Sequence, residues 1–107
     1  MPPGSSFNPQ QALNDAVGHH GAGRLAEAEA LYRQVLEVQP DHPDALHLLG
    51  VLADQSGNPD LAEDLITKAL AARPDFADAL SNLGNVLRKL GRPDDALQSL
   101  QKALDLE

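Results

Sequence analysis

The sequence repeats itself three times with a period of 34 residues, and this repeat constrains the fold more than any other feature. Residues 43–50 align with residues 77–84 at that offset, and the same offset places Gly23, Gly57 and Gly91 in one column. A fixed period of this length is typical of proteins in which identical units stack in a row and bury a continuous core between neighbours. The chain is therefore expected to form a solenoid.

Each copy is predicted to form two helices. In the middle copy, apolar residues at helical spacing predict one helix over residues 43–55 and a second over residues 59–72. Between them, Gly57 can adopt the left-handed conformation that ends a helix, Asn58 can cap the next helix, and Pro59 suits its first turn. Three copies give six helices in three antiparallel hairpins, and Ala and Leu, which favour helices, dominate the apolar residues.

Helix boundaries divide the chain into units. Asp41, followed by Pro43 just inside the expected helix, supplies an N-terminal signal for the second copy, and Pro74 closes that copy. We expect a flexible N-terminal lead over residues 1–8, a first copy over 9–42, a second over 43–76 and a third over 77–107.

Small residues recur where the two helices of a hairpin must cross. Gly50 and Gly84 share one column of the first helix, and Ala62 and Ala96 share one column of the second. With the turn glycine and the closing proline, these columns resemble the tetratricopeptide repeat, and in particular bacterial and O-GlcNAc-transferase-like arrays. The resemblance covers residues 9–107 and implies an all-α, right-handed superhelical solenoid whose concave face is lined by the first helix of each copy.

The first copy departs from the pattern. Ala12 and Asp15 occupy columns that hold leucines in the other copies. One interpretation is a terminal capping unit, in which a polar residue is tolerated because nothing packs outside it. The other is that the first helix slides and buries Leu13, Ala16 and Val17 instead. The sequence leaves both open.

Composition argues against several classes of function. The net charge is −8, whereas nucleic-acid and anionic-membrane binders are rich in Lys and Arg. There is no cysteine, no apolar run long enough to span a membrane and no signal-peptide pattern at the start. We therefore expect a cytoplasmic protein that binds neither nucleic acid nor membranes.

No residues suggest catalysis, a cofactor or a metal site. His19 and His20 are adjacent and point in different directions on a helix, and His42 and His47 lie five residues apart, which is poor spacing for shared ligation. No serine lies in a nucleophile-elbow motif, and the glycines lie at helix crossings and turns rather than in a phosphate-binding loop. The chain is not expected to be an enzyme.

The resemblance places a binding surface on the concave face. Asn82 matches the asparagines with which O-GlcNAc-transferase-like repeats hold a peptide backbone, although Leu48 interrupts that column; solvated surface asparagines are the other interpretation. Leu13, Leu48 and Asp78 occupy columns of the clamp for chaperone C-termini, so that activity is not supported. The candidate groove residues are His47, Val51, Asp54, Asn82, Asn85, Arg88 and Lys89.

Basic residues gather in the third copy, while the first two copies carry most of the negative charge. Arg88, Lys89 and Arg92 form this basic corner. One interpretation is a solvated helix end whose cations complement the helix dipole. The other is a contact for the acidic end of a partner.

The last helix carries more apolar residues than one partner helix can cover: Leu97, Leu100, Leu104 and Leu106. Solenoids normally need a capping element at such a position. Two hypotheses follow: the chain is the N-terminal piece of a longer repeat protein, or it forms a homo-oligomer through its C-terminal hairpin.

The sequence thus predicts a non-catalytic scaffold for protein–protein interaction. Its partner is expected to be a protein or peptide, bound on the concave surface or through the open C-terminal end. The alternative is an N-terminal recognition arm of a longer enzyme, because similar repeats precede glycosyltransferase and sulfotransferase domains.

Overall fold

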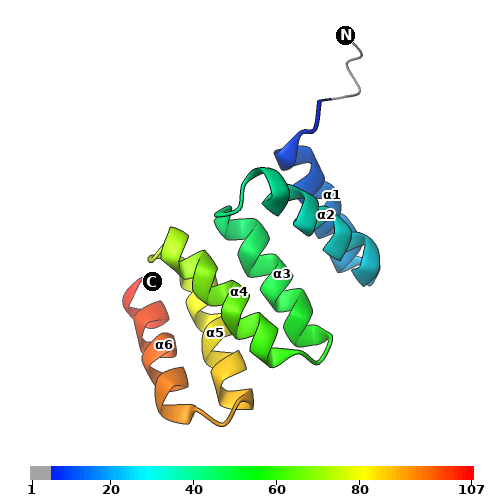
Figure 1. Ribbon diagram of the computed structural model, residues 1–107. Coiled ribbons are helices and arrows are strands. Elements are labelled where there is room, and N and C mark those ends of the chain that lie inside the picture. Colours follow the sequence, from blue (N-terminus) through cyan, green and yellow to red (C-terminus); the bar gives the residue numbers. More distant parts are fainter. Residues whose placement is uncertain (1–5) are drawn as a thin grey trace.

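The computed structural model describes residues 6–107 and shows six α-helices paired in three hairpins (Figure 1). The first five residues of the expected lead lie outside the described residues. The all-α solenoid of three antiparallel hairpins is confirmed. The helices are α1 (Pro9–Gly21), α2 (Leu25–Val38), α3 (Pro43–Gln55), α4 (Pro59–Ala72), α5 (Ala77–Lys89) and α6 (Pro93–Asp105).

The hairpins stand side by side in one row. The molecule measures 54 × 25 × 20 Å, and the α1/α2 and α5/α6 hairpins lie at opposite ends with α3/α4 between them (Figure 1). Within the row, α2 packs on α3 and α4 packs on α5. Each hairpin therefore shares its core only with its neighbours. Among residues 6–107, no helix has the length and apolar character that crossing a membrane requires.

The turn of the middle hairpin forms as its sequence predicts. Gly57 has a φ of 85°, in the left-handed region that favours glycine, and the Asn58 side chain accepts a hydrogen bond from the Leu61 backbone N–H at 3.2 Å. The expectation for Asp41 is wrong. The N-cap of α3 is His42, whose Nδ1 accepts from the Ala45 backbone N–H at 3.2 Å, because His42 directly precedes the first helical residue.

The small-residue columns lie where the helices of a hairpin cross. A Cβ added to Gly50 would lie 2.7 Å from Cγ1 of Ile66 on α4, and one added to Gly84 would lie 2.7 Å from Cγ of Leu100 on α6. Ala16, in the same column, is fully buried. The absence of a side chain thus lets a large residue of the partner helix fill each crossing.

The first hairpin keeps the register of the repeat. Ala12 and Ala16 are buried in their columns, and Leu13 is buried beside them. Asp15 and Val17 are exposed, so the interpretation in which α1 slides and buries Val17 is wrong. Asp15 lies at the outer side of the row, where no other hairpin packs against it among the described residues, and its charge stays in water.

Candidate partner-binding groove and end face

Most of the predicted groove residues line one cavity between α3 and α5. Its volume is about 240 Å³. Six of the seven candidates contribute to it, and two residues that the sequence analysis did not single out, Ile66 and Val86, line it as well. Both belong to the buried core, and no sequence signal distinguishes a core residue that also reaches a cavity. The candidates in the lining are Val51, Asp54, Asn82, Asn85, Arg88 and Lys89.

An ion pair links the two groove helices. Lys89 Nζ on α5 donates to Asp54 Oδ2 on α3 at 2.8 Å, and the Asp54 side chain is only 19% exposed. The other carboxylate oxygen of Asp54 is buried and has no hydrogen-bond partner among the described residues. A buried carboxylate oxygen without a partner is costly, so this side of the cavity favours a donor group.

His47, the seventh candidate, lies beside the cavity and is buried. Its Nε2 lies 2.8 Å from Nδ2 of Asn82 on α5, and its ring meets Phe76 edge-on at 4.8 Å between centroids. Burial lowers the pKa of His47, and the nearby charges of Asp78 and Asp44 partly oppose that effect. Burial therefore favours the neutral form of His47, and the contact between its ring and Asn82 orients that side chain.

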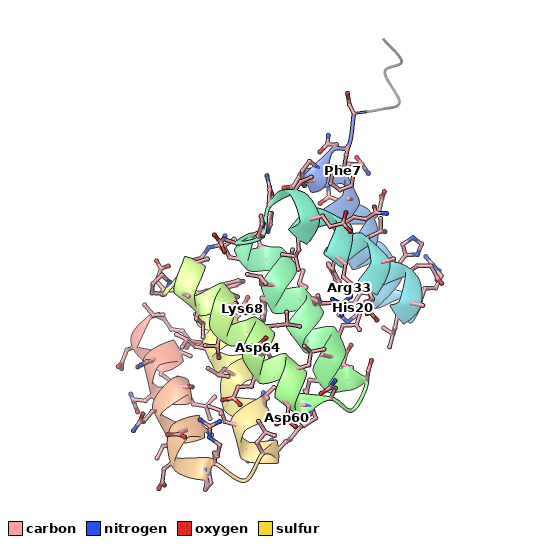
Figure 2. The ribbon with its side chains drawn as sticks, viewed as in Figure 1. Phe7, His20, Arg33, Asp60, Asp64 and Lys68 are labelled. Carbon is pink, nitrogen blue, oxygen red and sulfur yellow. The ribbon has the colours of Figure 1, made fainter. Side chains whose placement is uncertain are left out.

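The other three histidines also contact neighbouring groups. His20 lies 2.9 Å from the Tyr32 hydroxyl through Nδ1 and 2.7 Å from Gln55 Oε1 on α3 through Nε2, which ties the first hairpin to the second. Figure 2 shows His20 in the region where these two hairpins meet. His19 Nδ1 accepts from Arg24, and His42 caps α3. Within residues 6–107, no three His, Cys, Asp or Glu side chains are grouped in a way that could hold a metal ion.

The basic corner is largely neutralised by carboxylates. Arg92 pairs with Glu63 of α4 and with Asp95, and Lys89 pairs with Asp54. Arg88 is exposed and forms no salt bridge with the part of the chain that the structure describes. Of the three cations, Arg88 thus offers an unneutralised charge at the edge of the groove.

The apolar residues of the last helix divide into two sets. Leu97 and Leu104 are 67% and 60% exposed, and Leu106 is also exposed. Leu100 differs from the expectation. It is half-buried and fills the crossing against Gly84, because the helical period places it on the inner side with Ala96 and Ala103. The exposed face of α6 is therefore carried by Leu97 and Leu104, whereas Leu106 lies just beyond the end of the helix and points to another side.

A comparison with protein families identifies the class of this fold. The family model described as "Tetratricopeptide repeat" matches residues 19–75 and residues 47–106. The chain belongs to the tetratricopeptide repeat family, whose fold is typical of protein–protein interaction. Among curated proteins, no significant match to the chain was found.

Solved structures share this fold. MamA superposes with a TM-score of 0.85 at 20% identity, covering 92% of this chain and 58% of MamA. The second repeat domain of Spaghetti (RPAP3), bound to an HSP90 peptide, superposes with a TM-score of 0.88 at 17% identity and 92% coverage of both chains. A mutant O-GlcNAc transferase from Thermobaculum terrenum is 35% identical over 95% of this chain, with a TM-score of 0.82. The chain spans 58% of the MamA chain and 20% of that transferase.

Proposed function

We propose that this chain is a non-catalytic scaffold that binds an extended peptide segment of a partner protein in the groove between α3 and α5. The observation that carries this proposal is the convergence of six predicted residues on one cavity. A second surface for partners is the exposed face of α6. Both roles are consistent with a family whose fold is typical of protein–protein interaction.

The lining of the groove suits an extended peptide. Val51, Ile66 and Val86 supply apolar surface for one side chain of the ligand. An extended peptide leaves its own backbone N–H and C=O groups without partners inside the ligand. The exposed amide of Asn85 can pair with these groups, and so can the amide oxygen of Asn82, which accepts no hydrogen bond from the described residues. Specificity would then come from the side chain in the cavity and from charge at its edge.

Selection of binders from a random linear peptide library, with the full chain as bait, tests the groove. We expect selected peptides to bind the wild-type chain and to lose at least about tenfold in affinity to an Asn82→Ala/Asn85→Ala variant, which is about 1.4 kcal/mol. A Glu37→Ala variant, altered at an exposed position of α2 outside both proposed surfaces, should bind them unchanged. Circular dichroism checks that both variants fold. Peptides that bind the asparagine variant as tightly as wild type would contradict the groove proposal.

The alternative function is a recognition arm of a longer transferase. The 35% identity to the Thermobaculum terrenum O-GlcNAc transferase over 95% of this chain favours it. In that case, the groove would choose the protein substrate and the chemistry would occur in another domain. Sequencing the complete reading frame tests this alternative, which requires a transferase domain in the same polypeptide. A reading frame without one would contradict it.

A further inference from the structure

The contact between His47 and Asn82 fixes the hydrogen-bonding roles of both side chains. Nε2 of His47 on α3 lies 2.8 Å from Nδ2 of Asn82 on α5, so this contact crosses from the second hairpin to the third. The amide nitrogen of an asparagine carries two hydrogens and cannot accept a hydrogen bond. Nδ2 is therefore the donor and Nε2 the acceptor, which requires a neutral His47 ring with its proton on Nδ1.

The same contact decides which arm of the Asn82 amide is free. Asn82 belongs to the lining of the cavity, whereas His47 lies outside that lining. With Nδ2 turned toward His47, Oδ1 is left without a partner among residues 6–107, and it is not a buried atom. Turning the amide over would bring Oδ1 against the bare Nε2, so that two acceptors would face each other. The neutral ring thus holds Asn82 in the orientation that offers an acceptor to the groove.

Residues outside the groove hold the His47 ring in place. Phe76 meets this ring edge-on, with 4.8 Å between the ring centroids and 69° between the planes. The Arg73 guanidinium lies 4.7 Å from the centre of the Phe76 ring, and its Nη1 lies 3.4 Å from Oδ1 of Asp44. His47 itself is buried, so its ring cannot turn away from Asn82 without disturbing these contacts between two hairpins.

The charged groups around His47 leave its neutral form favoured. Burial is the largest effect and lowers the pKa of His47 from 6.5, whereas the charges of Asp78 on α5 and Asp44 on α3 raise it by less. Arg73 pairs with Asp44 and partly neutralises that carboxylate. Above pH 7 the ring is therefore neutral, and its Nε2 can accept from Asn82.

We infer that His47 is a positioning residue of the groove: while its ring is neutral, it turns the Asn82 amide so that Oδ1 accepts a hydrogen bond from a backbone N–H of the bound peptide. This inference rests on the proposed function and assigns a direction to one of its hydrogen bonds. Protonation of His47 adds a hydrogen to Nε2, which then faces the hydrogens of Nδ2. The amide must turn over, and it brings Nδ2 toward the peptide N–H, where two donors meet. Acid therefore weakens peptide binding.

The ring nitrogens of His47 provide a first test that needs no ligand. Nitrogen-15 chemical shifts distinguish a protonated ring nitrogen from a bare one, so NMR of the free chain at pH 7.5 identifies the tautomer. We expect Nδ1 to carry the proton and Nε2 to be bare. In an Asn82→Asp chain, where only acceptors face the ring, Nε2 should become protonated. A proton on Nε2 of the wild-type chain would overturn the inference, whatever the groove binds.

Peptides selected on the groove then test the direction of the hydrogen bond. Each backbone amide of one such peptide, chosen without histidine, is replaced in turn by an ester, which removes a single N–H donor. At pH 7.5 we expect one ester to weaken binding to the wild-type chain about fivefold, as for the loss of one hydrogen bond. The same ester should cost nothing further in an Asn82→Ala chain. Fluorescence anisotropy measures each affinity.

The His47→Phe variant separates positioning from packing, because it keeps an aromatic ring against Phe76 and removes Nε2. Asn82 can then turn either arm of its amide to the peptide, so the ester penalty should fall to about twofold. Wild type should bind about threefold more weakly at pH 5 than at pH 7.5, whereas His47→Phe should bind equally at both. The matched control is His19→Gln in the last turn of α1, outside the cavity lining, which should keep the wild-type pH dependence. Circular dichroism checks that the variants fold.

The other outcomes contradict the inference in ways that leave the groove proposal distinguishable. An ester penalty as large in His47→Phe as in wild type would show that His47 only packs. A scan without a sensitive position, or a wild-type affinity that is equal at pH 5 and 7.5, would show that His47 does not set the acceptor. Peptides bind in all of these cases, so the groove proposal stands. If no peptide binds the groove, the proposed function fails, and this inference fails with it.

Discussion

Gly50 illustrates how much depends on one absent side chain. A Cβ at this position would meet Ile66 Cγ1 at 2.7 Å and the Ala62 carbonyl oxygen at 3.3 Å. We expect Gly50→Ala to destabilise the chain by about 1–3 kcal/mol, because α3 and α4 must separate to admit the methyl group. Urea unfolding followed by circular dichroism measures the change.

The matched control is Gly18→Ala on α1, where a Cβ would meet nothing within 4 Å. Alanine favours a helix over glycine, so this variant should be more stable by about 0.4–1 kcal/mol. A Gly50→Ala variant as stable as wild type would mean that the crossing can relax at little cost.

His47 makes stability depend on pH. Its pKa is lowered from 6.5 by burial, so the unfolded chain takes up this proton more readily than the folded chain. The stabilisation by neutral His47 is complete above pH 6.5 and is lost as the pH falls through the unfolded value toward the folded one. We expect His47→Gln to flatten the decline in the free energy of unfolding between pH 7 and 5, at most by about 1.4 kcal/mol per pH unit.

Urea unfolding of both proteins at pH 5, 6 and 7 checks this expectation. The slope with pH is the informative quantity, because His47→Gln also removes the ring contact with Phe76 at every pH. Parallel profiles for the two proteins would show that His47 does not titrate differently in the folded and unfolded states.

At the scale of elements, the repeat predicts the helices closely because it fixes period and register together. The structure begins and ends α3 and α4 at the predicted residues 43–55 and 59–72. Local signals were less reliable where two candidates are adjacent. Asp is a more common N-cap residue than His, yet His42 rather than Asp41 caps α3, because His42 directly precedes the first helical residue.

Comparing equivalent positions of the three copies does not, in general, predict features that depend on how neighbouring helices pack. Leu100 is an exception: the 34-residue offset aligns it with Ile66, which is fully buried, so the repeat itself indicates that it packs inward against Gly84. The Asp54–Lys89 pair joins two different repeat columns, so aligning the copies does not reveal it. Ile66 reaches the groove only because α4 lies behind the gap between α3 and α5.

At the scale of the whole molecule, the row of hairpins predicts uneven stability. The middle hairpin has a neighbour on each side, whereas each outer hairpin has one. In a linear array, stability depends on these nearest-neighbour interfaces. We therefore expect backbone amides of α3 and α4 to exchange with deuterium most slowly and those of α1 and α6 most quickly. Equal protection in all three hairpins would instead indicate that the chain unfolds only as one cooperative unit.

Three side-chain contacts between neighbouring hairpins each join residues that are 35 positions apart, and they limit how this chain can change in length during evolution. His20–Gln55, His47–Asn82 and Asp54–Lys89 each connect neighbouring hairpins across the turns between their helices. An insertion or deletion of one residue near residue 50 would rotate one part of α3 relative to the other by about 100° and separate two of these pairs, His20–Gln55 and His47–Asn82, at once. Gain or loss of a complete 34-residue unit preserves every remaining pair. Variation in length among such arrays should therefore occur by duplication or loss of whole hairpins.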